Sequence, residues 1–191
     1  MNTGRLEAFS DGVIAILITI MVLELKVPHG TGLDALRPLV PVFLSYVLSF
    51  VYLGIYWNNH HHMFHAAERV NGSILWANLH LLFWLSLVPF ATGWMGENGV
   101  APLPVASYGG ILFMAGVAYF VLTRQLAAHH GSDSKLARAI GRDAKGLLSL
   151  VIYAAAILLS FLSTWIAIAL YVVVALMWIV PDRRIERVFA E

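Results

Sequence analysis

The sequence contains no cysteine, which excludes disulfide frameworks, thiolate ligands and cysteine nucleophiles. Charge is scarce as well: 12% of the 191 residues are charged, about half the share of an ordinary soluble domain. The formal net charge of +1 gives no sign of nucleic acid as a partner. Hydrophobic residues, in contrast, make up 60% of the chain, and its mean hydropathy is +0.78. These values predict an integral membrane protein.

Long apolar segments predict an all-α fold with six membrane-spanning helices in a single domain over residues 1–191. The expected helices cover residues 5–27, 36–59, 74–94, 104–123, 146–162 and 164–180. The first would be about 34 Å long, enough for a hydrocarbon core of about 30 Å. Residues 146–180 carry no charge. As one helix they would be about 52 Å long, which is too long for a bilayer without extreme tilt, so we expect a tight turn near Ser163 and Thr164. Residues 124–145 are interpreted as a solvated basic linker, in part helical.

The basic residues predict how these helices are oriented. With six spans and a cytoplasmic N-terminus, the outer loops hold only Lys26 and Arg37, and all other basic residues are cytoplasmic. The positive-inside rule requires this asymmetry. The cytoplasmic set is Arg5, Arg69, Arg124, Lys135, Arg138, Arg142, Lys145, Arg183, Arg184 and Arg187. We therefore expect a multi-pass protein of the cell membrane with both termini in the cytoplasm.

The first helix places a carboxylate at the start of an apolar run. Asp11 is followed by residues 12–23, which carry no charge. A charge costs about 2.5–3.5 kcal/mol at the centre of a membrane helix and less near its end, so Asp11 is expected to face protein or water.

The same helix has a second, apolar face. At 3.6 residues per turn, Ile16, Ile20 and Leu23 form a stripe with Thr19 beside it, and Asp11 points away from it. Such a stripe either packs against lipid and other helices or lines a pore that gates by dewetting. The pattern alone does not choose between the two. Beyond it, Glu24 is either an interfacial charge or part of a vestibule.

Polar side chains of the second and third expected helices lie at the depth of Ser10 and Asp11. Their hydroxyl, imidazole, amide and indole groups can satisfy one another in one network. His61 and His65, four residues apart, have a spacing that can chelate a cation. No H-E-x-x-H pattern accompanies them, and we expect no metal site. Protonation of the histidines near pH 6.5 is a further way to bias the network.

Three stretches carry a resemblance to a known family. Arg5-x-x-x-Phe9-Ser10-Asp11 before an uncharged helix resembles the signature of the transmembrane protein 175 family of endolysosomal potassium channels, in its prokaryotic branch. Trp57-x-x-His60-His61-x-x-Phe64 is similar to a second stretch of that family. Trp76-x-Asn78-Leu79 with Leu87-Val88-Pro89-Phe90-Ala91-Thr92 is similar to a third.

The resemblance implies a homotetramer of six-helix chains whose first helices line a central path for potassium. It implies no T-V-G-Y-G filter, and this sequence has none. Ile16, Ile20 and Leu23 match the apolar constriction, and Thr19 matches a hydroxyl position linked with selectivity. The network that holds the pore helix is matched by Arg5, Ser10, Asp11, His60 and Trp76. Phe9, His61 and Asn78 belong to the signature stretches.

The expected function is a weakly discriminating, potassium-selective cation channel without a cofactor. Its partners would be copies of itself, membrane lipids and monovalent cations. A proton or cation leak, or a carrier that uses Asp11 and the histidines, is the alternative, although carriers usually have broken helices and repeated halves. A metal-dependent intramembrane enzyme is less favoured, because neither an activated nucleophile nor paired carboxylates are visible.

Overall fold

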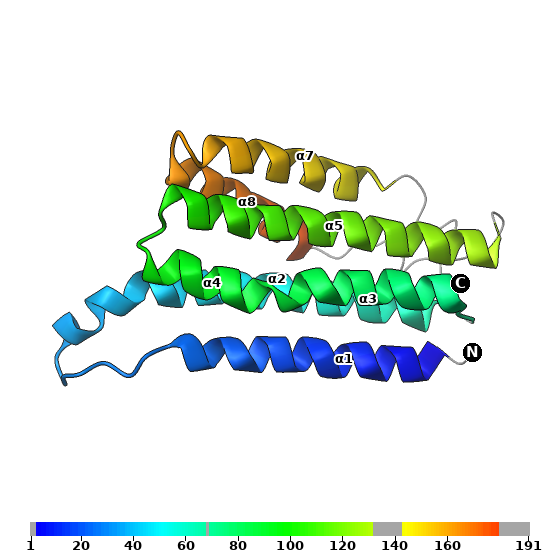
Figure 1. Ribbon diagram of the computed structural model, residues 1–191, viewed down its shortest axis with the longest axis horizontal. Helices are drawn as coiled ribbons and strands as arrows, with labels where there is room; N and C mark the ends of the chain where they lie inside the picture. The colour runs from blue at the N-terminus through cyan, green and yellow to red at the C-terminus, as the bar shows by residue number, and fades with distance from the viewer. Residues whose placement is uncertain (1–2, 68, 132–142, 180–191) are drawn as a thin grey trace.

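The structure, a computed structural model, describes residues 3–67, 69–131 and 143–179. These residues form a bundle of long helices joined by short loops (Figure 1). The helices are α1 (Thr3–Ile20), α2 (Val40–His65), α3 (Gly72–Ser86), α4 (Val88–Glu97), α5 (Pro102–His130), α7 (Ala144–Leu159) and α8 (Thr164–Ile179), with short 3₁₀ turns η1 (Met21–Glu24), η2 (Leu33–Ala35) and η3 (Arg37–Leu39) between α1 and α2. The expected all-α class is confirmed. The basic residues of the expected linker and C-terminus at 135, 138, 142, 183, 184 and 187 lie outside the described residues.

Among the residues that the structure describes, four stretches are long and apolar enough to cross a membrane, which confirms a multi-pass membrane protein. They are Thr3–Glu24, Leu33–His65, Gly72–Glu97 and Pro102–His130. Helices α7 and α8 are apolar but shorter, with 16 residues each. The chain turns between them over residues 160–163, where Ser163 N–H donates to the Leu159 carbonyl at 2.8 Å.

Several helices differ from their expected bounds, among them α1 and α2, and two of the differences have a clear local reason. The expected helix over 74–94 is interrupted at Leu87, because Pro89 opens α4 and has no N–H to continue the hydrogen-bond ladder of α3. Helix α5 extends through the first part of the expected linker, to His130. Leu126 is fully buried there, and Gly131, with φ of 86°, ends the helix.

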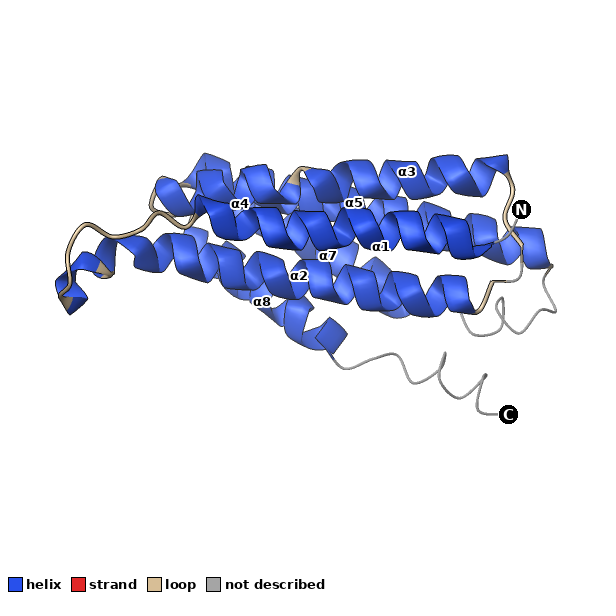
Figure 2. Ribbon diagram, turned by 90° about the horizontal axis from the view of Figure 1, so that it is seen from below, coloured by secondary structure: helices blue, strands red, loops and turns tan. Residues whose placement is uncertain are grey.

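The helices are arranged with α1 along one edge of the bundle and α7 along the opposite edge (Figure 1). Helix α1 packs on α2, α3 and α4, whereas α5 packs on α3, α4 and α7. Figure 2 shows α1 lying over the space between α2 and the α3–α4 pair. One face of α1 is therefore held by the bundle, and the other is turned away from it.

Buried tyrosines form the centre of the bundle behind α2. The Tyr52 hydroxyl donates to the Tyr171 carbonyl at 2.6 Å, and the Tyr171 hydroxyl donates to the Val105 carbonyl at 3.1 Å. The Tyr108 ring lies edge-on to both, with centroid distances of 6.4 and 5.7 Å. Gly109 leaves the space that the Tyr171 hydroxyl occupies. This core ties α2 and α5 to α8 and gives α1 a fixed support.

Candidate functional site

Helix α1 has one buried and one exposed face. The buried side chains are Leu6, Ser10, Ile14, Leu17 and Met21. The exposed side chains include Phe9, Ile16 and Ile20 of α1 and Leu23 of the following turn η1, with exposed fractions of 53%, 62%, 45% and 77%. Apolar side chains that stay this open within one chain require another apolar surface, either lipid or a copy of the protein.

The exposed stripe contains the predicted constriction residues in the predicted register. Ile16, Ile20 and Leu23 follow one another at intervals of four and three residues and all point away from the bundle. Thr19 lies beside them, and its hydroxyl donates to the Ala15 and Ile16 carbonyls at 3.0 Å. With its hydrogen used inside the helix, the Thr19 oxygen keeps a lone pair toward the exposed side. The stripe thus presents apolar side chains and one oxygen acceptor.

A buried hydrogen-bond chain joins the other face of α1 to α3 and α2. The Asn78 amide donates to the Ser10 hydroxyl at 2.8 Å, and the Ser10 hydroxyl donates to the Leu6 carbonyl at 2.9 Å. The Asn78 carbonyl oxygen accepts from His60 Nε2 at 2.8 Å. All three side chains have exposed fractions of 0%. Because leaving such groups unpaired is costly in an apolar environment, this series of hydrogen bonds fixes α1 against its neighbours.

Two buried polar atoms near this chain have no hydrogen-bond partner in the part of the protein that the structure describes. They are Asp11 Oδ1 and His60 Nδ1. His60 uses its Nε2 hydrogen on Asn78, so its Nδ1 presents a lone pair in the neutral ring. Both atoms are therefore acceptors.

Beside these atoms, Glu7 and His61 pair across α1 and α2. Glu7 Oε1 lies 2.8 Å from His61 Nδ1. The His61 ring stacks between Trp57 and His65, with centroid distances of 6.0 and 6.1 Å. Glu7 was not singled out from the sequence. Its position four residues before Asp11, on the same side of the helix, is the signal that marks it.

Three signature residues lie outside this polar cluster. Phe9 and Trp76 are exposed on α1 and α3, with 53% and 75% of their surface open. Arg5 is exposed and makes no ion pair with the described residues. The structure thus brings together Ser10, Asn78 and His60, with Asp11 and His61 beside them, and leaves Arg5, Phe9 and Trp76 on the surface.

At the other end of α1, the charged residues belong to a different pair. Lys26 Nζ lies 2.6 Å from Glu97 Oε1, which joins the α1–α2 loop to the end of α4. The hydrogen bond that Lys26 donates to Glu97, together with the charge of this carboxylate, raises the pKa of Lys26 above the ordinary value of 10.5. Glu24 lies against Gly93 and does not pair with Lys26. Tertiary packing brings Glu97 to Lys26, and no pattern in the sequence predicts this pair.

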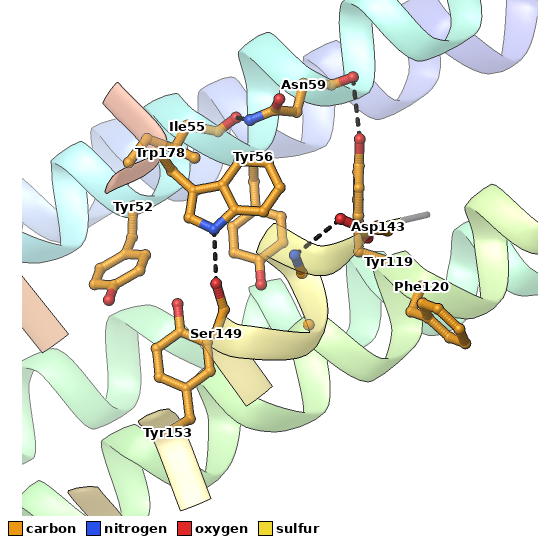
Figure 3. Close-up of a pocket in the computed structure, with 12 residues that line it drawn as sticks. Tyr52, Ile55, Tyr56, Asn59, Tyr119, Phe120, Asp143, Ser149, Tyr153 and Trp178 are labelled. Carbon is orange, nitrogen blue, oxygen red and sulfur yellow. Dashed lines mark hydrogen bonds between the residues drawn. The ribbon is translucent and has the colours of Figure 1, made fainter. Parts of the chain in front are cut away.

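A small cavity lies on the far side of the bundle from the exposed stripe (Figure 3). Its volume is about 40 Å³, and residues of α2, α5, α7 and α8 line it, among them Tyr56, Tyr119, Tyr153 and Trp178. Trp178 Nε1–H donates to the Ser149 hydroxyl at 2.8 Å, and Gly146 N–H donates to Asp143 at 2.8 Å. The cavity has room for water. Since α1 does not line it, it is separate from the stripe.

Comparison with known proteins finds a matching family model and similar proteins. Residues 5–89 match the model of the family described as "Endosomal/lysosomal potassium channel TMEM175". A protein named "Potassium channel" from Chryseobacterium sp. is 54% identical over the whole of both chains. Another of that name, from Chamaesiphon minutus, is 32% identical over 92% of each chain.

The fold agrees with a solved structure. The crystal structure of a lysosomal potassium-selective channel TMEM175 homolog from Chamaesiphon minutus matches with a TM-score of 0.81 and 33% identity. The match covers 94% of this chain and 97% of that one. The resemblance seen in the three sequence stretches is confirmed: this chain belongs to the TMEM175 family.

Proposed function

We propose that this protein is a potassium-conducting cation channel whose ion path is lined by the exposed face of α1 from four copies of the chain. The observation that carries the proposal is the open stripe of Ile16, Ile20 and Leu23 on a helix whose opposite face is fixed by buried hydrogen bonds. One helix face cannot enclose a path, whereas several copies around an axis can. The names of the bacterial relatives support potassium as the permeant ion.

The proposal includes six spans with both termini in the cytoplasm. Helices α7 and α8 supply the last two, each about 24 Å long at 1.5 Å per residue. They are shorter than a hydrocarbon core of about 30 Å, a mismatch that local thinning or flanking residues can accommodate. The distribution of basic residues then puts the end with Ser10, His60 and Asn78 in the cytoplasmic half. The location is the cell membrane.

The stripe acts as a hydrophobic constriction in this arrangement. Ile16, Ile20 and Leu23 would each form a ring, with one side chain from each copy, and a narrow apolar ring holds water poorly. Conduction therefore requires either that the rings widen or that the ion crosses a short dry zone. Thr19 places one oxygen acceptor per chain between the rings and can replace part of the hydration shell of a cation. Glu24, exposed at the end of the stripe, attracts cations to the mouth. No bound cofactor is needed for these roles.

The buried network positions the constriction. Ser10 lies six residues before Ile16 on α1, and its bonds to Asn78 fix the rotation of that helix. A rotation of about 100°, one residue of the helix, would replace the stripe by its neighbours. The proposed role of Ser10, Asn78, His60 and Asp11 is thus to hold the register of the pore helix.

Potassium flux into proteoliposomes tests the proposal. Purified protein is reconstituted with a potassium gradient, with sodium as the competing ion and a proton ionophore as control. Wild type is expected to conduct potassium, and Ile16→Asn is expected to raise flux because an amide wets the constriction. Ile166→Asn makes the same change on the exposed surface of α8 and is expected to leave flux unchanged. No cation flux from folded tetramer would rule the channel out.

A proton leak or carrier is the second candidate, because His60 is a buried ionisable group and Asp11, on the neighbouring helix, has one buried carboxylate oxygen. Flux that follows a proton gradient and disappears in His60→Gln, with potassium flux absent, would support it instead. The enzyme hypothesis has no further support, since the family is one of ion channels.

A further inference from the structure

Glu7, Asp11 and His61 form a compact set of ligand atoms between two helices. One carboxylate oxygen of Glu7, one of Asp11 and one ring nitrogen of His61 all lie within 4.8 Å of one another. Glu7 and Asp11 stand four residues apart on α1, and His61 faces them from α2. The packing of α1 on α2 assembles the set.

One residue of this set, Asp11, has a carboxylate oxygen without a hydrogen-bond donor in the described part of the protein. This oxygen, Oδ1, is buried. A buried carboxylate oxygen without a donor is unfavourable by several kcal/mol unless a proton, water or cation satisfies it. Buried His60 Nδ1, next to His61 in the sequence, is also without a partner there. The unpaired Asp11 oxygen favours a positively charged occupant at the set.

The donor types select the class of ion. An imidazole nitrogen with two carboxylate oxygens suits zinc and related divalent transition metals, whereas magnesium and calcium prefer oxygen ligands alone. Tetrahedral bonds of about 2.0–2.1 Å separate the ligand atoms by about 3.3 Å. Glu7 and His61 lie 2.8 Å apart and all three ligand atoms lie within 4.8 Å of one another, so small side-chain rotations bring the three atoms to this spacing.

The set is open to an ion from the polar end of the bundle. The side chain of His61 is 43% exposed and that of Glu7 is 18% exposed. Three protein ligands leave a fourth position for water. A metal bound there would bridge α1 and α2 independently of the hydrogen bonds of Ser10.

We propose that Glu7, Asp11 and His61 bind one divalent transition-metal ion of the zinc class per chain and so link α1 to α2. The site does not depend on the proposed channel function. Binding removes the proton from any protonated ligand, so protons compete with the metal for the site.

Calorimetric titration of zinc into the tag-free, chelator-treated full chain in detergent tests this proposal. Wild type is expected to bind one zinc ion per chain, with a rise in thermal unfolding temperature, and magnesium is expected not to compete. His61→Gln and Asp11→Asn are each expected to weaken zinc binding by tenfold or more. His29→Gln, an exposed histidine in the α1–α2 loop, is the matched control and is expected to keep wild-type affinity. Cobalt substitution reports the geometry through its visible absorption.

Several outcomes would overturn the proposal. Zinc affinity unchanged in His61→Gln would place the ion elsewhere, for example at His129 and His130. Equal affinities for magnesium and zinc would show that the three residues act only as a non-selective acidic patch. Absence of zinc binding at millimolar concentration would show that water or a proton satisfies Asp11. If Asp11→Asn does not fold, His61→Gln still decides the question, because this side chain is half-exposed.

Discussion

Removal of Asn78 is expected to loosen the attachment of α1. Its amide makes the two buried bonds that connect Ser10 with His60, at 2.8 Å each. Hydrogen bonds between membrane helices contribute about 0.6 kcal/mol on average and up to about 1.7. Two of them give about 1–3 kcal/mol, so Asn78→Ala, which also loses packing, is expected to destabilise the protein by about 2–4 kcal/mol. Ser10→Ala, which loses one of the bonds, is expected to cost about 1 kcal/mol.

A double-mutant cycle with Ser10→Ala and Asn78→Ala isolates their bond. The free energy of unfolding is measured by titration with a denaturing detergent in mixed micelles, followed by tryptophan fluorescence. The expected coupling energy is about 0.6–1.7 kcal/mol. Ser86→Ala is the control, because its hydroxyl is exposed and donates only to a carbonyl of its own helix, that of Phe83. Strictly additive effects of Ser10→Ala and Asn78→Ala would refute the reasoning, since residues without a shared interaction do not couple.

Three further changes are expected to have measurable effects on stability. Gly109→Ala places a methyl group against the Tyr171 hydroxyl and is expected to destabilise the fold by about 1–3 kcal/mol. Gly110→Ala is the control, because Gly110 has open space around it, and it is expected to be neutral or stabilising. Thermal unfolding in detergent compares the stability of the two variants. Asn71→Ala removes the side chain that caps α3 by accepting from Ile74 N–H and is expected to cost about 1 kcal/mol, while Asn71→Asp keeps the cap; equal stability of the two variants would contradict this role. Lys26→Met removes the exposed pair with Glu97, and its small effect is expected to vanish in high salt. Because the pKa of Lys26 is raised in the folded state, the contribution of the pair is present below pH 10 and is lost as the pH rises through that pKa; a constant difference from wild type up to pH 12 would contradict the assignment.

Local rules in the sequence predict much of α1 but little of its surroundings. The 3.6-residue period places Ile16, Ile20 and Leu23 on one face and Ser10 on the other, and the structure has the same division. The period cannot tell whether lipid or another chain covers the stripe, because both are apolar. Pro89, whose missing N–H interrupts the expected helix at Leu87, is also a local signal in the sequence.

Interactions between distant residues could not be predicted from the sequence. The tyrosine core needs Tyr52 to meet Tyr171, which lies 119 residues further along the chain. Lys26 meets Glu97 for the same reason, and no spacing rule connects them. The pairing of Glu7 with His61 required the relative rotation of two helices, which only packing determines.

In the proposed channel, the exposed face of α1 lines the ion path. Because the chain has no cysteine, one introduced thiol at a time can be tested with a membrane-impermeant, positively charged thiol reagent during potassium flux. The reagent is expected to block Leu23→Cys, while wild type and Val172→Cys, exposed on α8, are expected to be unaffected. Flux through Leu23→Cys that is insensitive to the reagent, although the thiol is labelled in detergent, would contradict this arrangement and place the stripe of α1 against lipid.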